Sequence, residues 1–139
     1  MDPTYLQLEV TESAAMDNPA RTFGILDALR QRGLHIYIDD FGTGYSNLGQ
    51  LKRMPIDALK IDKSFVNDVL VVSDDAEIVN AIIRLAHALN LRVVAEGVER
   101  EEQVSFLRQN GCDEIQGYVV SKPLTPVKAG ELFATRYTF

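Results

Sequence analysis

Residues 34–62 read LHIYIDDFGTGYSNLGQLKRMPIDALKID, and this stretch decides the fold of the chain. Leu34–Ile38 and Ala58–Ile61 are short apolar runs, which predict β-strands. Between them, Leu48–Met54 predicts a short helix that Pro55 closes. Two strands joined through a helix form a βαβ unit, whose strands pair in parallel.

The same alternation of strands and helices continues on both sides of this unit. Strands are predicted at Tyr5–Val10, Leu91–Ala95 and Glu114–Val119. A helix is predicted from Pro19, with Asn18 as its N-cap and Gly33 after its end, and another after a capping box of Asp74 and Glu77. The remaining predicted helices are Glu101–Asn110, which ends before Gly111, and one from Thr125-Pro126 through Leu132-Phe133. Five strands alternating with helices predict an α/β fold with one parallel sheet. Several of the strands are apolar almost throughout, which predicts that both faces of the sheet are covered.

Composition and charge narrow the classes of function. The chain has 139 residues and a formal net charge of −6, which argues against nucleic acid or an anionic membrane as a partner. A small phosphorylated ligand held through metal ions stays compatible with this charge. Cys112 is the single cysteine, so a disulfide within the chain is excluded and a reducing compartment is favoured. No apolar run approaches the roughly 18 residues of a membrane span, and the first residues do not resemble a signal peptide.

Polar side chains gather where the predicted strands end. They are Glu9 and Glu12 for the first strand, Asp39 and Asp40 for the second, Lys60 and Asp62 for the third, Glu96 and Glu99 for the fourth, and Gln116 within the fifth. Ligands of parallel α/β folds bind at the carboxyl ends of the strands. Converging acids repel one another unless cations neutralise them, and carboxylate and amide oxygens suit Mg²⁺ or Mn²⁺.

The adjacent acids Asp39 and Asp40 are suited to two metal ions about 4 Å apart, an arrangement that displaces groups at phosphorus. Lys60 adds a positive charge that can hold a water molecule or a phosphoryl oxygen. After Asp40, the segment Phe41-Gly42-Thr43-Gly44-Tyr45-Ser46 predicts a loop, because its two glycines permit positive φ and close backbone approach. Such a loop can shape or cover a site. It is not a Walker A motif, since no Lys-Ser/Thr pair follows.

Five segments of the chain resemble successive motifs of the EAL domain family. They are Glu9-Val10-Thr11-Glu12, Asp39-Asp40-Phe41-Gly42-Thr43-Gly44-Tyr45-Ser46, Lys60-Ile61-Asp62, Glu96-Gly97-Val98-Glu99 and Gln116-Gly117-Tyr118. Their order along nearly the whole chain makes the resemblance specific, whereas each motif alone is weak. The resemblance implies a TIM-like barrel in a bacterial, cytoplasmic phosphodiesterase that hydrolyses cyclic-di-GMP to linear pGpG.

The resemblance also implies roles for individual side chains. Glu9 and Asp39 are metal ligands, Asp40 serves the second metal, Lys60 positions the attacking water, Glu96 is a second-metal ligand or activates the water, and Gln116, Asp62 and Glu99 line the site. Glu12 anchors the loop from Phe41 to Ser46, which couples metal binding to dimer formation in the family. Two Mg²⁺ or Mn²⁺ ions are expected, and Ca²⁺ is expected to inhibit.

One departure from the family pattern is large. A TIM-type barrel has about 250 residues, so residues 1–139 are expected to correspond to roughly the C-terminal five βα units of an incomplete barrel. The Glu-Ala-Leu signature, an Asn ligand and a phosphate-gripping Arg are expected upstream. The 139-residue chain alone is therefore expected to be inactive or weakly active. An open sheet is also expected to form homo-oligomers, including forms with exchanged strands or helices, and Phe41–Met54 is a second candidate contact.

Other interpretations remain open at this point. The chain can be a non-catalytic cyclic-di-GMP sensor or a protein-interaction module. A phospho-accepting receiver domain has a similar acid pair and lysine, but here Lys60 comes too early in the strand order. Structural roles compete for single residues: Asp39-Asp40 as a helix cap, Lys60 as a stem packed on apolar surface, Glu99 as the cap of the helix from Glu101, Gln116 bonded to a neighbouring loop, and His35, His87 and Cys112 as packing groups.

Overall fold

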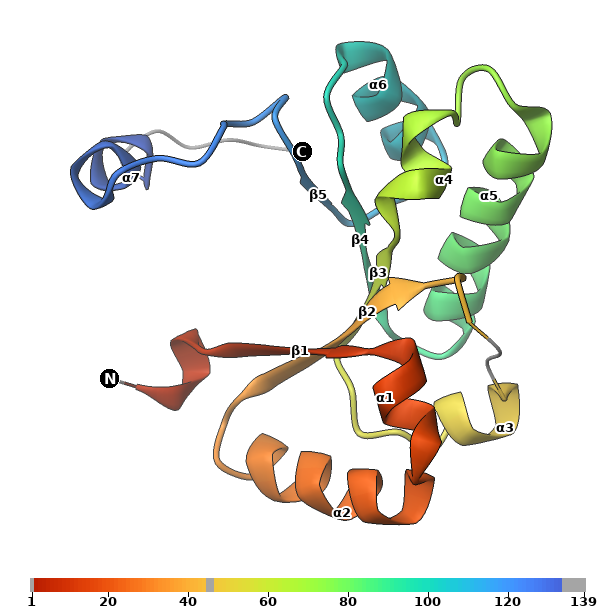
Figure 1. Cartoon of the computed structure of the whole chain (residues 1–139), viewed down its shortest axis with the longest axis vertical. Helices are drawn as coiled ribbons and strands as arrows, with labels where there is room; N and C mark the ends of the chain where they lie inside the picture. Colours follow the sequence, from red (N-terminus) through yellow and green to blue (C-terminus); the bar gives the residue numbers. More distant parts are fainter. Residues whose placement is uncertain (1, 45–46, 134–139) are drawn as a thin grey trace.

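The computed structural model describes residues 2–44 and 47–133, which form one parallel β-sheet with helices around it (Figure 1). The sheet has five strands in the order β1-β2-β3-β4-β5. Their bounds are β1 (Gln7–Thr11), β2 (His35–Phe41), β3 (Ala58–Ile61), β4 (Arg92–Glu96) and β5 (Glu114–Gln116). All four neighbouring pairs are parallel. The predicted α/β fold is thus confirmed.

Helices connect the strands and gather in two groups (Figure 1). They are the 3₁₀ helix η1 (Pro3–Tyr5) and the α-helices α1 (Glu12–Asp17), α2 (Pro19–Arg30), α3 (Leu48–Leu51), α4 (Lys63–Asn67), α5 (Ser73–Ala88), α6 (Glu101–Gln109) and α7 (Pro126–Phe133). Helices α1 to α3 lie beside β1 and β2, α4 to α6 lie beside β3 and β4, and α7 stands apart at the end of an extended segment. None of the helices that are described is long and apolar enough to cross a membrane.

The two faces of the sheet differ in polarity. Successive side chains of a strand point to opposite faces, and the register aligns them across the strands. One face is apolar and forms the main core with the helices; its buried residues include Ile36, Ile38, Leu59, Ile61, Val93 and Ala95. The other face carries most of the polar side chains, among them Glu9, Asp39, Lys60, Arg92, Glu96, Glu114 and Gln116. The candidate site therefore lies on the face opposite the core.

The prediction that both faces are covered holds for the central strands only. All four residues of β3 are buried, whereas the residues of β1 alternate between exposed and half-buried. Because β1 and β5 are the edge strands, each has one side without a strand partner among the described residues. Unpaired backbone groups at a sheet edge invite pairing with another chain.

A β-bulge interrupts the pairing of β2 with β3. Ile38 pairs with Leu59 and Phe41 pairs with Ile61, so three residue steps in β2 face two in β3. Asp40 has a φ of +54°, which is uncommon for a residue other than glycine. The bulge lets Ile38 and Phe41 both enter the apolar core. The side chains of Asp39 and Asp40, which lie between these two residues, are consequently both on the polar face of the sheet.

Several predicted element boundaries are wrong. The second strand continues to Phe41 instead of ending at Ile38, and the short helix after it ends at Leu51 instead of Met54. Tyr5 belongs to η1 rather than to a strand, because Asp2 caps a 3₁₀ turn by accepting the backbone N–H of Thr4. Helix α5 begins at Ser73 after Val72, which provides no side-chain cap, so the predicted capping box of Asp74 and Glu77 does not form. The fifth strand ends at Gln116 instead of Val119.

Two short helices were not predicted. Helix α1 begins directly after β1 because the Thr11 hydroxyl accepts the backbone N–H of Ala14. Helix α4 begins directly after β3 because Asp62 caps it by accepting the N–H of Ser64 at 2.8 Å. The predicted N-cap of α2 is confirmed, since Asn18 Oδ1 accepts the N–H of Arg21.

We expect a polypeptide of these 139 residues to self-associate through its open sheet edges. Size-exclusion chromatography with light scattering at micromolar concentration should give a dimer or a larger species. A monomeric mass over the whole concentration range would contradict this prediction.

Candidate active site

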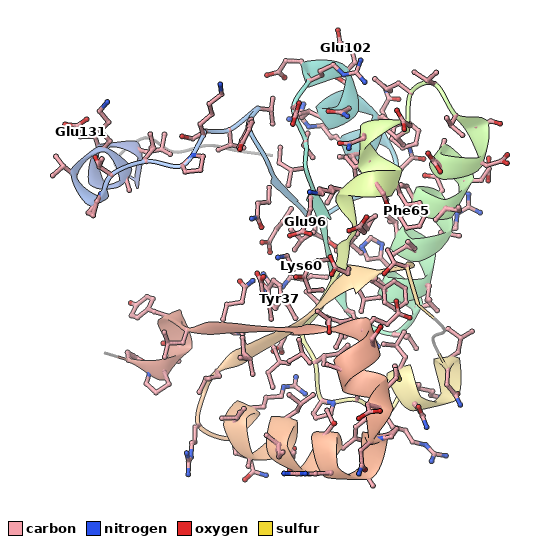
Figure 2. The ribbon with its side chains drawn as sticks, viewed as in Figure 1. Tyr37, Lys60, Phe65, Glu96, Glu102 and Glu131 are labelled. Atoms are coloured by element: carbon pink, nitrogen blue, oxygen red, sulfur yellow. The ribbon has the colours of Figure 1, made fainter. Side chains whose placement is uncertain are left out.

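Lys60 lies at the centre of the polar face with its ammonium group surrounded by carboxylates. Its side chain is only 2% exposed, and Nζ lies 2.7 Å from Glu9 Oε1 and 2.6 Å from Glu96 Oε1. Asp39 Oδ1 lies 3.7 Å from the same nitrogen. Figure 2 shows Lys60 and Glu96 on neighbouring strands, far from Glu131 of α7. Lys60 is thus held through its charge as well as through its aliphatic stem.

Burial and pairing act against each other on the charges of this group. Burial by itself lowers the pKa of Lys60, but the hydrogen bonds to Glu9 and Glu96 outweigh it and raise the pKa above its ordinary value. Burial raises the pKa of Glu96, and Lys60 opposes that rise. Lys60 therefore remains protonated at neutral pH. It can donate hydrogen bonds and supply positive charge, but it cannot serve as a general base.

Asp39, Asp40 and Glu96 form a cluster whose carboxylate oxygens lie within 4.8 Å of one another. The bulge in β2 makes this possible, because it leaves two successive aspartates on the polar side. Burial, followed by the charges of Asp39 and Asp62, raises the pKa of Asp40. Four carboxylates therefore gather near the single ammonium group of Lys60. Glu9, Asp39 and Glu96 pair with it directly, and Asp40 belongs to the same cluster. The excess negative charge and the all-oxygen donor set fit a divalent cation such as Mg²⁺ or Mn²⁺.

Four of the candidate residues lie inside strands rather than at their ends, which corrects the expectation. Asp39 and Asp40 precede Phe41, the last residue of β2. Glu9 is the third residue of β1, because the strand continues until Thr11 pairs with Asp39. Lys60 is the third residue of β3. Their long side chains nevertheless bring their charged groups together with Glu96, the last residue of β4.

Asp62 lies beside this cluster and caps α4. Its Oδ1 accepts the backbone N–H of Ser64 at 2.8 Å and also bonds the Ser64 hydroxyl. Burial acts to raise the pKa of Asp62, but the bonds from Ser64 lower it overall. Asp62 is therefore ionised, and it adds to the negative charge that raises the pKa of Asp40.

The loop after β2 is tied down by a buried acid. Glu12, the first residue of α1, is 2% exposed, and its Oε2 accepts the N–H groups of Gly42 at 3.1 Å and Gly44 at 3.3 Å. Thr43 donates its hydroxyl to the carbonyl of Asp40 at 2.8 Å, and Phe41 is buried in the core. A Cβ on Gly44 would lie 3.2 Å from Glu12 Cδ, so a larger residue would push the two apart. Tyr45 and Ser46 lie outside the described residues.

A pocket of about 300 Å³ opens next to the acid cluster. Its lining is formed by Lys63, Glu96, Gly97, Glu99, Gln116, Gly117 and Tyr118. Glu96 and Gln116 are neighbours in the sheet, as the last residues of β4 and β5. The pocket thus brings together Glu96, Glu99 and Gln116, which the sequence predicted to lie at one site.

Glu99 does not cap α6, because that helix begins at Glu101 with Arg100 as its N-cap residue. Instead, the backbone N–H of Glu99 donates to Gln103 Oε1 at 2.9 Å, and the Glu99 side chain belongs to the pocket wall. His87 and His35 are partly exposed rather than in the core, and each lies near an aspartate, Asp113 at 2.9 Å and Asp57 at 3.8 Å.

Three side chains on or near the polar face were not predicted from the sequence. Lys63 lines the pocket. Its position directly after Asp62, a predicted site residue, is the sequence feature that could have indicated this. Arg92 donates hydrogen bonds to Glu114 at 2.6 Å and to the Tyr37 hydroxyl at 2.5 Å. This group lies on the polar face of the sheet, at the amino ends of β4 and β5. Gln103 carries no sequence signal, since a glutamine near a helix start is ordinary.

The chain is thus an α/β domain with an acidic cluster beside a pocket on one face of its parallel sheet. The sequence model of the EAL domain matches residues 1–123, and the chain belongs to the EAL domain family. The five parallel strands are consistent with part of a TIM-like barrel, as the resemblance implied.

Several known proteins are similar to the chain. Cyclic di-GMP phosphodiesterase NbdA of Pseudomonas aeruginosa is 51% identical over 135 residues, which is 97% of this chain and 17% of the relative. The bifunctional diguanylate cyclase/cyclic di-GMP phosphodiesterase MucR of the same organism is 50% identical over 124 residues, 89% of this chain and 18% of the relative. The chain therefore spans less than a fifth of these curated relatives.

Solved structures are also similar to the chain. The c-di-GMP complex of the PaMucR phosphodiesterase superposes with a TM-score of 0.90 at 48% identity, covering 93% of this chain and 52% of that chain. A manganese/cy-diGMP complex of Klebsiella pneumoniae BlrP1 gives a TM-score of 0.80 at 36% identity, covering 88% of this chain and 31% of that chain.

We expect Asp40→Asn to stabilise the metal-free protein and to weaken its binding of Mn²⁺. Asparagine tolerates the positive φ of this position and removes one of the mutually repelling charges. Thermal unfolding without metal should give a higher Tm than the unaltered chain, and the rise in Tm on adding MnCl₂ should shrink.

Asp17→Asn, at an exposed position in α1, is the matched control and should leave the Mn²⁺-dependent rise unchanged. Equal rises for both variants would show that Asp40 does not contribute to a metal site.

Proposed function

We propose that the chain supplies part of a metal-dependent phosphodiesterase site that hydrolyses one phosphodiester bond of cyclic-di-GMP and yields linear pGpG. The observation that carries this proposal is the cluster of Asp39, Asp40 and Glu96 around protonated Lys60, beside a pocket of about 300 Å³. Similarity to cyclic-di-GMP phosphodiesterases supports the substrate.

In this proposal, four carboxylates hold two Mg²⁺ or Mn²⁺ ions: Glu9, Asp39, Asp40 and Glu96. Such ions, when bound, lower the pKa of a bound water and offset the charge that develops at phosphorus. Lys60 keeps its proton and orients the attacking water or a phosphoryl oxygen by hydrogen bonding. Gln116, Asp62 and Glu99 line the substrate side of the site.

Ca²⁺ is proposed to inhibit. It takes six to eight oxygen ligands at longer distances than Mg²⁺, so it fits the same oxygens in a different geometry. The complexes of BlrP1 with cy-diGMP include one with manganese and one with calcium.

We further propose that Glu12 links this site to assembly. Through Gly42 and Gly44, it fixes the loop that starts one residue after Asp40. A shift of Asp40 on metal binding would therefore be passed to this loop, and the loop is a candidate contact of a homodimer. The bacterial cytoplasm is the proposed compartment, in keeping with the single free thiol of Cys112.

Residues 1–139 are proposed to form the C-terminal part of one EAL domain, with further metal ligands and a phosphate-gripping arginine on its other strands. The matched share of the PaMucR structure, 52%, supports this. The 139-residue polypeptide alone should then hydrolyse cyclic-di-GMP weakly or not at all. Chromatography of the products after incubation with MnCl₂ measures this. Turnover well above that of Glu96→Ala would contradict it.

The catalytic role is tested in a protein that contains the whole domain. Lys60→Met should lower kcat/KM by about 10²-fold or more, because it removes a preorganised positive charge from the reacting centre. Lys128→Met, at an exposed position in α7, should have no effect.

The alternative of a cyclic-di-GMP sensor gives a different outcome. Calorimetry would then show binding of cyclic-di-GMP with Ca²⁺, while no turnover occurs with Mg²⁺ or Mn²⁺. That result would replace the proposed phosphodiesterase by the sensor.

A further inference from the structure

Gln103 is a buried polar side chain that lies just outside the pocket. It is the third residue of α6 and only 2% exposed. Its Nε2 donates to the carbonyl of Val66 at 2.9 Å and to that of Asn67 at 3.4 Å. Its Oε1 accepts the backbone N–H groups of Glu99 at 2.9 Å and Arg100 at 3.0 Å. One amide group therefore bridges two segments of backbone.

Each of these segments contains, or is continuous with, a residue that lines the pocket. Val66 and Asn67 form the last turn of α4, whose first residue, Lys63, lines the pocket. Glu99 and Arg100 end the loop that follows β4, and Glu99 also lines the pocket. Gln103 itself does not line the pocket, so its effect on a ligand must pass through these two segments.

The loop after β4 packs closely against α4 at a second point. Gly97 has a φ of +69°, and a Cβ there would lie 2.7 Å from Lys63 Cβ. Arg100 adds a longer contact, from Nη2 to the carbonyl of Asn67 at 3.4 Å. These contacts leave little freedom between loop and helix once the bridge through Gln103 is in place.

Glutamine suits this position because the bridge needs a donor at one end and an acceptor at the other. The last carbonyls of a helix have no partner within the helix, and buried backbone groups are costly to leave unpaired. A methionine would fill the same space and pair none of these groups. An ionised glutamate would accept from the loop but repel the carbonyls of α4.

We infer that Gln103 is a positioning residue: by linking the loop of residues 97–100 to α4, it sets the spacing of Glu99 and Lys63 across the pocket. The identity of the pocket's ligand rests on the proposed function, whereas the link itself is a property of the chain. A residue that only filled space would be replaceable by methionine without local change.

The link is tested by amide hydrogen exchange, followed by NMR, in Gln103→Met. The amides of Glu99 and Arg100 should exchange about tenfold faster or more, while the amides of β3 keep their rates. Asn110→Ala removes a side-chain bond to Phe106 at the other end of α6 and should leave Glu99 and Arg100 unchanged. Unchanged rates in Gln103→Met, or an equal rise at every amide, would overturn the inference.

A second measurement needs no substitution. In the unaltered chain, the side-chain NH₂ protons of Gln103 should exchange slowly, and those of exposed Gln109 on the same helix should exchange fast. Equal, fast exchange of both would overturn the bridge even if Gln103→Met failed to fold.

The consequence for the pocket is measured with cyclic-di-GMP in the protein containing the whole domain. Gln103→Met and Gln103→Glu should each raise KM about tenfold with a smaller change in kcat, because each breaks the link to α4. Faster exchange with unchanged KM would refute the positioning role. Absence of hydrolysis by the unaltered protein would instead refute the proposed function and leave the exchange test to decide the link.

Discussion

The ion pairs of Lys60 with Glu9 and Glu96 are the interaction on which the rest of the polar face depends. A nearly buried ammonium group is costly unless it is paired, and carboxylates converging on one place repel one another without a cation. Each side therefore requires the other: Nζ lies 2.7 Å from Glu9 and 2.6 Å from Glu96. The pairing makes Lys60 a fixed positive charge and leaves an excess of negative charge for a divalent ion.

The backbone is shaped to supply that excess. The bulge in β2 sends Ile38 and Phe41 to the core and leaves Asp39 and Asp40 for the site, at the cost of a positive φ at Asp40. Polar side chains then hold the surrounding loops through backbone groups. Glu12 holds the loop after β2 through two N–H groups, and Gln103 holds the loop after β4 through two more. The same fold places an apolar core on one face of the sheet and a preorganised charged site on the other.

Much of this was predictable from sequence, because periodicity reports on burial and βα alternation forces parallel pairing. Strand Ala58–Ile61 was predicted with its observed bounds. The short helices α1 and α4 were missed because helices of six and five residues show no clear period, and only their N-cap residues, Thr11 and Asp62, indicate them. Neither the bulge nor the bridge through Gln103 was predictable, since each depends on partners distant in the sequence. The assignment of Asp39, Asp40 and Glu96 to one metal site stays a prediction until an ion is observed there.

The most direct test of the central claim is a crystal structure of a protein containing this domain, grown with MnCl₂ and recorded with anomalous scattering from manganese. We expect an anomalous peak bounded by the carboxylates of Asp39, Asp40 and Glu96, with the Lys60 ammonium group still hydrogen-bonded to a carboxylate of the cluster. A map without manganese at these carboxylates, while ions bind elsewhere on the protein, would contradict it.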